Sequence, residues 1–126
     1  MYFSEYIEQQ YELNELHYKQ TKDNITEYRK CGINKINAIK NFAKLLDIDD
    51  AVVRFKQYLF CSPVLYLELE DRTIEDILKV VKDNNISHLF TDYNNRFSFI
   101  FNNEIIVVSK SDFNIVMLEC KIQKFL

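Results

Sequence analysis

The spacing of the apolar residues changes once along this chain, close to Pro63. Upstream of that residue, apolar side chains recur every three or four positions, which places them on one face of an α-helix. Downstream, Leu65, Leu67 and Leu69 alternate with other residues, which is the pattern of a strand with one buried face. Because the strand patterns gather after the helical ones, the sequence predicts an α+β fold with an antiparallel sheet.

Three helices are expected in the first half of the chain. The first begins near Ser4 and ends near Cys31, where Gly32 can take the left-handed conformation that often follows a helix. The second covers residues 36–46, and the third covers residues 49–60, with an aspartate as its cap.

One further helix is expected after the strand at residues 65–69. Thr73 and Asp76 match a capping box, in which each side chain satisfies a backbone N–H of the other residue at the start of a helix. Three strands and two tight turns follow, at residues 96–101, Asn102-Asn103, 104–109, Ser111-Asp112 and 114–122.

The expected architecture is an N-terminal three-helix half, residues 1–61, packed on a small antiparallel sheet with one further helix, residues 62–126. A chain of 126 residues that is 48% hydrophobic is long enough for one core and too short for two ordinary domains. We therefore expect residues 1–126 to form a single domain.

Composition excludes several kinds of site. Glycine occurs once, at Gly32, so a Gly-rich phosphate loop, a dinucleotide fingerprint and a nucleophile elbow are excluded. Cys31, Cys61 and Cys120 are widely spaced, which favours free thiols over a disulfide framework or a zinc site. A thiolate pair of Cys61 with His88 lacks an orienting acid. No apolar stretch reaches membrane-spanning length, so we expect a cytoplasmic protein without membrane contact. Because the motifs above are missing, no cofactor or metal is expected either.

The N-terminal segment carries an acidic stripe at helical spacing. Its acidic members are Glu5, Glu8, Glu12 and Glu15, with Tyr2 and Tyr6 beside them. Two interpretations stay open. The stripe is either a solvated helix face, or a row of carboxylates about 5 Å apart per turn that imitates nucleic-acid phosphates.

Residues 42–54 resemble the helix-turn-helix family of DNA-binding domains. The segment reads Phe-Ala-Lys-Leu-Leu-Asp-Ile-Asp-Asp-Ala-Val-Val-Arg, with a small residue in the first helix, a Leu-Leu pair and a Val-Val-Arg second helix. The resemblance implies a DNA-binding regulator. However, Asp49 and Asp50 would face the phosphates, so we favour ordinary packing of a helix pair over residues 36–60.

Glu119-Cys120-Lys121 has the ExK form of a family of metal-dependent nucleases. That resemblance implies that Glu119 and a second acid, either Glu104 or Asp112, hold a divalent cation while Lys121 activates a water. The alternative is an ion pair on a solvent-facing strand, which we prefer.

The function that the sequence favours is a small non-enzymatic inhibitor that binds a basic protein. In size, acidity and lack of motifs it is similar to anti-CRISPR-like anti-defence proteins of phages or plasmids and to toxin-immunity proteins. The expected contacts are Tyr2, Tyr6 and the acidic stripe, and the expected partner is a nucleic-acid-binding effector or a nuclease. Residues 29–57 are locally basic, with seven Lys or Arg against three Asp, and they are the alternative contact surface. A homodimer is also compatible with the sequence.

Overall fold

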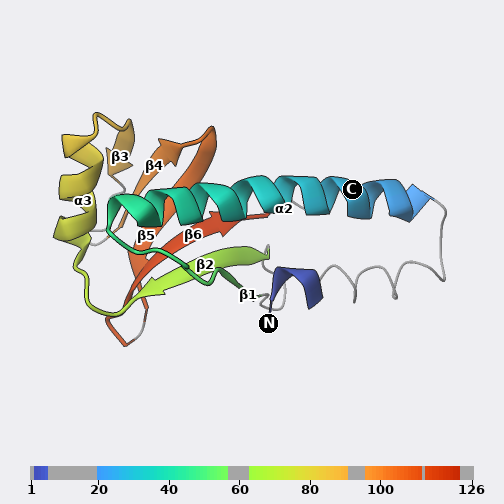
Figure 1. Ribbon diagram of the computed structural model, residues 1–126, viewed down its shortest axis with the longest axis horizontal. Coiled ribbons are helices and arrows are strands. Elements are labelled where there is room, and N and C mark those ends of the chain that lie inside the picture. Colours follow the sequence, from blue (N-terminus) through green and yellow to red (C-terminus); the bar gives the residue numbers. More distant parts are fainter. Residues whose placement is uncertain (1, 6–19, 57–62, 91–95, 112, 123–126) are drawn as a thin grey trace.

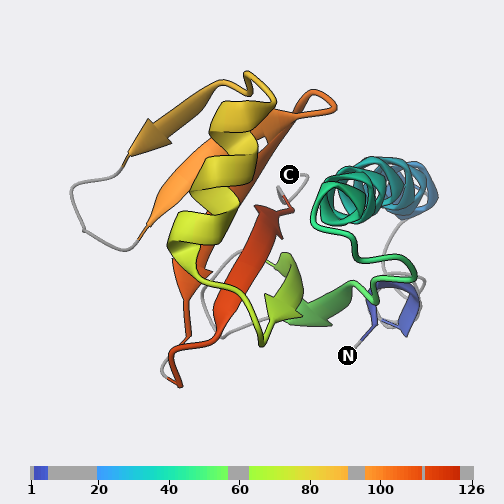
Figure 2. The same cartoon turned by 60° about the vertical axis from the view of Figure 1, so that its left-hand side comes forward.

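A computed structural model describes residues 2–5, 20–56, 63–90, 96–111 and 113–122 (Figure 1). In chain order the elements are α2 (Gln20–Leu45), β1 (Arg54–Lys56), β2 (Val64–Leu69), α3 (Ile74–Asp83), β3 (His88–Phe90), β4 (Phe97–Phe101), β5 (Glu104–Lys110) and β6 (Val116–Lys121). The strands form one six-stranded sheet in the order β1-β2-β6-β5-β4-β3. Every neighbouring pair is antiparallel. Helices α2 and α3 lie against the same face of this sheet (Figures 1 and 2).

The prediction of an N-terminal three-helix half on a small sheet is therefore wrong. Helix α2 runs without a break from Gln20 to Leu45, so the first two expected helices are not separated at Gly32. A glycine inside a helix costs about 1 kcal/mol relative to alanine. Here glycine is needed for a tertiary contact, because a Cβ at Gly32 would overlap the ring of Phe3.

The third expected helix is also wrong over the residues that the structure describes. Residues 51–53 are extended and lead into β1. Burial alternates there: Ala51, Val53 and Phe55 are buried, whereas Val52 and Arg54 are exposed. This alternation is the period of a strand. Ala51, Val53 and Phe55 all belong to the core, and Phe55 is the cross-strand partner of Leu65 in β2.

Helix α2 ends in a turn built by aspartates. The backbone N–H groups of Leu46 and Ile48 both donate to the carbonyl oxygen of Ala43, each at 3.0 Å. Asp47 takes a φ of 60° and Asp50 a φ of 38°. Aspartate tolerates this left-handed region better than most residues do. The left-handed position expected at Gly32 thus lies at Asp47, where the chain leaves the helix.

The second half of the chain agrees with its prediction in most respects. The Thr73 side chain accepts from the N–H of Asp76 at 3.1 Å, and the Asp76 carboxylate accepts from the N–H of Thr73 at 2.9 Å, so the capping box is confirmed. Asn102 and Asn103 have φ values of 51° and 62° in the turn between β4 and β5, as a tight hairpin requires.

Two details of this half differ from the prediction. Strand β3, which pairs with β4, was not expected. Strand β6 begins at Val116 because Asn114 has a φ of 61° and belongs to the preceding turn. In that turn the Ser111 hydroxyl accepts from the N–H groups of Phe113 at 3.3 Å and Ile115 at 3.2 Å. Asp112 lies outside the described residues.

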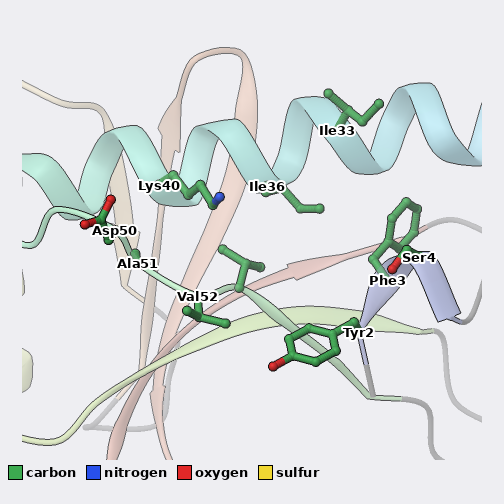
Figure 3. Close-up of a pocket in the computed structure, with 10 residues that line it drawn as sticks. Tyr2, Phe3, Ser4, Ile33, Ile36, Lys40, Asp50, Ala51 and Val52 are labelled. Atoms are coloured by element: carbon green, nitrogen blue, oxygen red, sulfur yellow. The ribbon is translucent and has the colours of Figure 1, made fainter.

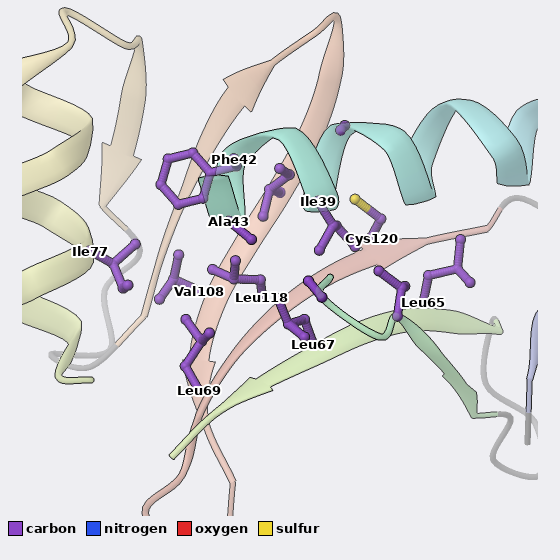
Figure 4. Close-up of a cluster of buried hydrophobic side chains, with 14 of the residues drawn as sticks. Ile39, Phe42, Ala43, Leu65, Leu67, Leu69, Ile77, Val108, Leu118 and Cys120 are labelled. Carbon is purple, nitrogen blue, oxygen red and sulfur yellow. The ribbon is translucent and has the colours of Figure 1, made fainter. Parts of the chain in front are cut away.

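The core fills the space between the sheet and the two helices (Figure 4). Phe42 of α2 is central to it, with its ring centroid 4.4 Å from that of Phe99 and 5.6 Å from that of Phe101. Helix α3 contributes Ile77 and Val81, which are fully buried. No helix within the described ranges is long and apolar enough to cross a membrane.

Candidate functional site

A groove of about 640 Å³ lies between the N-terminal segment, the outer side of α2 and the extended chain before β1 (Figure 3). Its lining residues come from these three places, and they are Tyr2, Phe3, Ser4, Ile33, Ile36, Lys40, Asp50, Ala51, Val52 and Val53. Its volume lies within the range of ordinary ligand pockets, and most of the lining side chains are apolar.

Phe3 attaches the N-terminal segment to the rest of the molecule. Its side chain is buried against Gly32 of α2, and its ring centroid lies 6.1 Å from that of Phe55. The backbone N–H of Tyr2 donates to the Glu5 carboxylate at 3.1 Å, which satisfies a free donor where the helical residues 3–5 begin. Tyr2, which lines the groove, is thereby held next to Glu5.

The walls of the groove expose three large apolar side chains. Tyr2 is 51% exposed, Ile33 is 55% exposed and Val52 is 54% exposed. Ile33 and Ile36 are one helical turn apart on α2, whereas Val52 points outward because its neighbours Ala51 and Val53 point into the core. Binding an apolar group here would remove these side chains from water, which is the main source of affinity in such a site.

One carboxylate, that of Asp50, lines the groove, and Figure 3 shows it at the end opposite Phe3 and Ser4. A second, that of Glu5, accepts from the N–H of the lining residue Tyr2. Asp47 and Asp49 are exposed in the turn that carries Asp50. Lys40 is the single cationic residue among the lining residues. The lining of this apolar groove therefore carries one residue of each charge, and the turn beside it adds two carboxylates.

The predicted contact residues fall into two groups. Tyr2 and Glu5 are exposed, and Tyr2 lines the groove. Tyr6, Glu8, Glu12 and Glu15 lie outside the described residues, so the acidic stripe stays a prediction beyond Glu5.

The helix pair expected over residues 36–60 is absent from the part of it that the structure describes. Asp49 and Asp50 lie in a turn, and Arg54 begins a strand, so none of the three is on a second helix. The structural element that a helix-turn-helix protein inserts into the major groove is missing over residues 46–56.

Glu119 and Glu104, one of the two acid pairs proposed for a cation site, do not meet; Asp112, the other candidate partner of Glu119, lies outside the described residues. Glu119 forms an ion pair with Lys56 at 3.6 Å, and Lys56 also lies over the ring of Tyr66 at 4.8 Å from its centroid, on the sheet face that the helices leave open. Glu104 forms an ion pair at 2.8 Å with Lys35 of α2 on the other side. Among the described residues no group of three or more His, Cys, Asp or Glu could hold a metal ion.

Cys120 is a buried free thiol, as expected for this residue. Its Sγ donates to the carbonyl oxygen of Ile105 at 3.4 Å. Burial raises the pKa of Cys120 to about 12, so the thiol stays protonated near neutral pH and is a poor nucleophile. Cys61 lies outside the described residues, so its pairing with His88 is not described.

Sequence reasoning missed the groove itself, including Phe3, Ile33 and Val52. The alternating pattern of residues 51–55 was the signal for the outward position of Val52, and it was read as a helix. The contact of Phe3 with Gly32 has no local signal, because it joins residues far apart in the sequence. Comparisons with known protein families, with curated proteins and with solved structures find no significant match.

Proposed function

We propose that this protein is a small non-enzymatic inhibitor that binds a basic protein partner through the groove and the N-terminal segment. The observation that supports this proposal is an apolar groove whose lining includes Asp50 and whose adjoining turn exposes Asp47 and Asp49. A partner segment with an apolar side chain beside basic residues matches that pattern.

The apolar walls would supply most of the affinity. Interfaces derive their binding energy from a few well-packed anchors, with aromatic residues prominent among them. Tyr2, Ile33 and Val52 are each about half exposed, so an anchor that enters between them would bury surface from three sides. Tyr2 also offers a phenol group for a hydrogen bond at the rim.

The carboxylates would act mainly on the rate of association. Charges at the rim of an interface steer encounter and change binding strength less. Asp50 lines the groove and Glu5 contacts the N–H of Tyr2, and Glu8, Glu12 and Glu15 would add further negative charge in the predicted stripe. An effector or nuclease would bind this protein through the same basic surface that binds nucleic acid. Nucleic acid could then no longer reach that surface.

The biological settings that fit this proposal are anti-defence by a phage or plasmid, as with anti-CRISPR-like proteins, and immunity against a nuclease toxin. A DNA-binding regulator is less well supported, because residues 51–56 are extended where a second helix would be required. A nuclease that uses Glu104 as its second acid is less well supported, because Glu104 and Glu119 lie on opposite sides of the sheet.

The test begins with capture of partners from the native cell by the tagged protein. Wild type should retain a basic protein in stoichiometric amount, and Val52→Lys should not.

The acidic surface is then tested by a variant in which Glu5, Glu8, Glu12 and Glu15 are all Gln. It should fold normally, associate more slowly with the captured partner and lose the salt dependence of that rate.

A matched control removes four acidic side chains elsewhere. The control substitutions are Glu70→Gln, Asp71→Asn, Glu75→Gln and Asp83→Asn, all at exposed positions. This variant has the same net charge as the first one and should associate at a nearly normal rate. The proposal is wrong if the two variants slow association equally, or if Val52→Lys binds and inhibits like wild type.

A further inference from the structure

The sheet face turned away from α2 and α3 carries an apolar patch. In β4, Phe97 and Phe99 are buried beneath the helices, so Ile100 points to the opposite side. The exposed fractions are 55% for Ile100 and 62% for its cross-strand partner Ile105. Leu89 of the edge strand β3 is 74% exposed.

These three side chains are neighbours. Ile100 and Ile105 are directly opposite in the β4–β5 pair, and Leu89 is opposite Ser98, two positions before Ile100. Cross-strand partners lie about 5 Å apart and diagonal neighbours about 7–8 Å apart. Leu89, Ile100 and Ile105, together with Ser98 and Val107 between them, are called the sheet patch below.

We infer that the sheet patch is the centre of an interface with a second copy of this chain. Three side chains that are each more than half exposed amount to an apolar surface on the order of 300 Å², which is the size at which a patch is commonly functional. A standard stable interface buries about 800 Å² per partner. The patch supplies the apolar part of such an interface.

Charge is what favours a second copy over a basic partner. The sheet patch contains no charged residue, so placing it on its own image brings no like charges together. The neighbouring half of the face, on β1, β2 and β6, carries both signs, and its charged residues are Arg54, Lys56, Lys121, Glu68 and Glu119.

The expected dimer has a two-fold axis that lies in the interface and runs across the strands. This axis places each half of the sheet face opposite the same half of the second copy. An interface of this kind must be self-complementary. The uncharged sheet patch meets that requirement. The mixed half of the face then forms a polar rim on one side of the apolar patch.

The inference is independent of the proposed function. The groove lies on the outer side of α2, and the sheet patch lies on β3, β4 and β5. Val52 and Ile100 provide a matched pair of positions, since both are β-branched and their exposed fractions are 54% and 55%. A lysine at either position adds the same charge to a different surface.

The experiment is sedimentation velocity of the full chain over a wide range of concentrations. Wild type should sediment as a dimer that dissociates on dilution. Ile105→Lys and, separately, Ile100→Lys should raise the dimer dissociation constant about 100-fold. The dimer contains each substitution twice, and each copy is expected to cost a factor of about ten. Val52→Lys should leave the dissociation constant unchanged.

Two results would overturn the inference. One is a wild-type protein that is monomeric at every concentration. The other is a dimer that Ile105→Lys and Ile100→Lys leave intact while far-ultraviolet circular dichroism shows them folded. If one of these variants fails to fold, Leu89→Lys replaces it, because Leu89 is the most exposed member of the patch and its side chain is 74% exposed already.

Discussion

The groove and the sheet patch expose similar apolar side chains in different electrostatic surroundings. Val52 in the groove and Ile100 in the sheet patch are almost equally exposed. The groove is lined by Asp50 and Lys40 and adjoins the exposed Asp47 and Asp49, whereas the sheet patch itself contains no charged residue. The comparison teaches that apolar exposure alone marks a contact surface, and that the charges around it indicate which kind of partner fits.

The largest effect is expected from a substitution at Phe42, because the packing of α2 on the sheet supports both the groove and the sheet patch. Phe42 fixes α2 on the sheet through Phe99 and Phe101. Phe42→Ala should lower the free energy of unfolding by about 3–5 kcal/mol, because it leaves a cavity in a close-packed core. Urea denaturation measures this loss. Leu45→Ala, on the same helix but 40% exposed, is the control and should cost much less; equal losses would contradict the central role of Phe42.

The next substitution should affect the groove and spare the sheet patch. Gly32→Ala introduces a methyl group that overlaps the Phe3 ring. Displacement of that ring should cost about 1–3 kcal/mol, less the gain of about 1 kcal/mol from alanine in a helix. Binding of the basic partner should weaken, while the dimer dissociation constant should not change.

A double-mutant cycle isolates this contact. Phe3→Ala removes the ring, so Gly32→Ala should be less harmful, or even stabilising, in that background. Neighbouring residues of this kind show coupling energies of about 0.5–3 kcal/mol. Strictly additive effects on the free energy of unfolding would show that Phe3 does not lie against Gly32.

A smaller effect is expected from a cap distant from the groove. Thr73→Ala should cost about 1 kcal/mol of stability, because the N–H of Asp76 loses its acceptor at the start of α3. Chemical denaturation of wild type and variant measures this difference. Both binding constants should stay unchanged under conditions where the variant is folded, which separates a general loss of stability from damage to either surface.

The same cap predicts a pH dependence. The hydrogen bond from the Thr73 backbone N–H, followed by that from its side chain, lowers the pKa of Asp76 below its ordinary value. A carboxyl group whose pKa is lower in the folded state stabilises the fold above its unfolded pKa, and this contribution is lost as the pH falls below about 4. Asp76→Asn should therefore flatten the acid side of the stability profile measured by urea denaturation. An unchanged profile would contradict the capping role of the ionised carboxylate.

The smallest effect on stability is expected from Lys40→Gln, which changes only the charge of the groove. Lys40 is the exposed cation of the groove. Lys40→Gln should change the free energy of unfolding by no more than about 0.5 kcal/mol. Because it makes the groove more acidic, it should speed association with a basic partner at low salt. Stopped-flow mixing measures that rate, and a slower rate would indicate that the groove prefers an acidic partner.

What the sequence could predict is limited to interactions between near neighbours. The capping box of Thr73 and Asp76 and the turn at Asn102-Asn103 depend on residues at most three positions apart, and both are confirmed. Strand β3 was missed because its formation depends on pairing with β4. The continuous α2 was missed because a glycine usually signals an end, whereas Gly32 accommodates a ring that is distant in sequence.

The same limit applies to the candidate site. Tyr2 and Glu5 were predicted as contacts; both are exposed, and Tyr2 lines the groove, but their role in binding stays a prediction. The groove could not be predicted, because it exists only when α2 and residues 50–53 come together. The error over residues 51–56 has a general cause: short apolar runs fit a helix and a strand almost equally well, and pairing with β2 decides between them.

The order of strands in the sheet also bears on how the chain folds during synthesis. Strand β2 joins the rest of the sheet through β6, in pairs such as Val64 with Lys121 and Leu69 with Val116. Contacts between residues so distant in sequence require the intervening chain to close as a loop, which slows folding. Helix α2 and the β1–β2 pair emerge from the ribosome well before β6. Until residues 116–121 follow, the edge of β2 has no partner strand, and an unpaired edge of this kind is open to pairing with other chains. The nascent protein would therefore be most prone to aggregation in the interval that ends when β6 takes its place between β2 and β5.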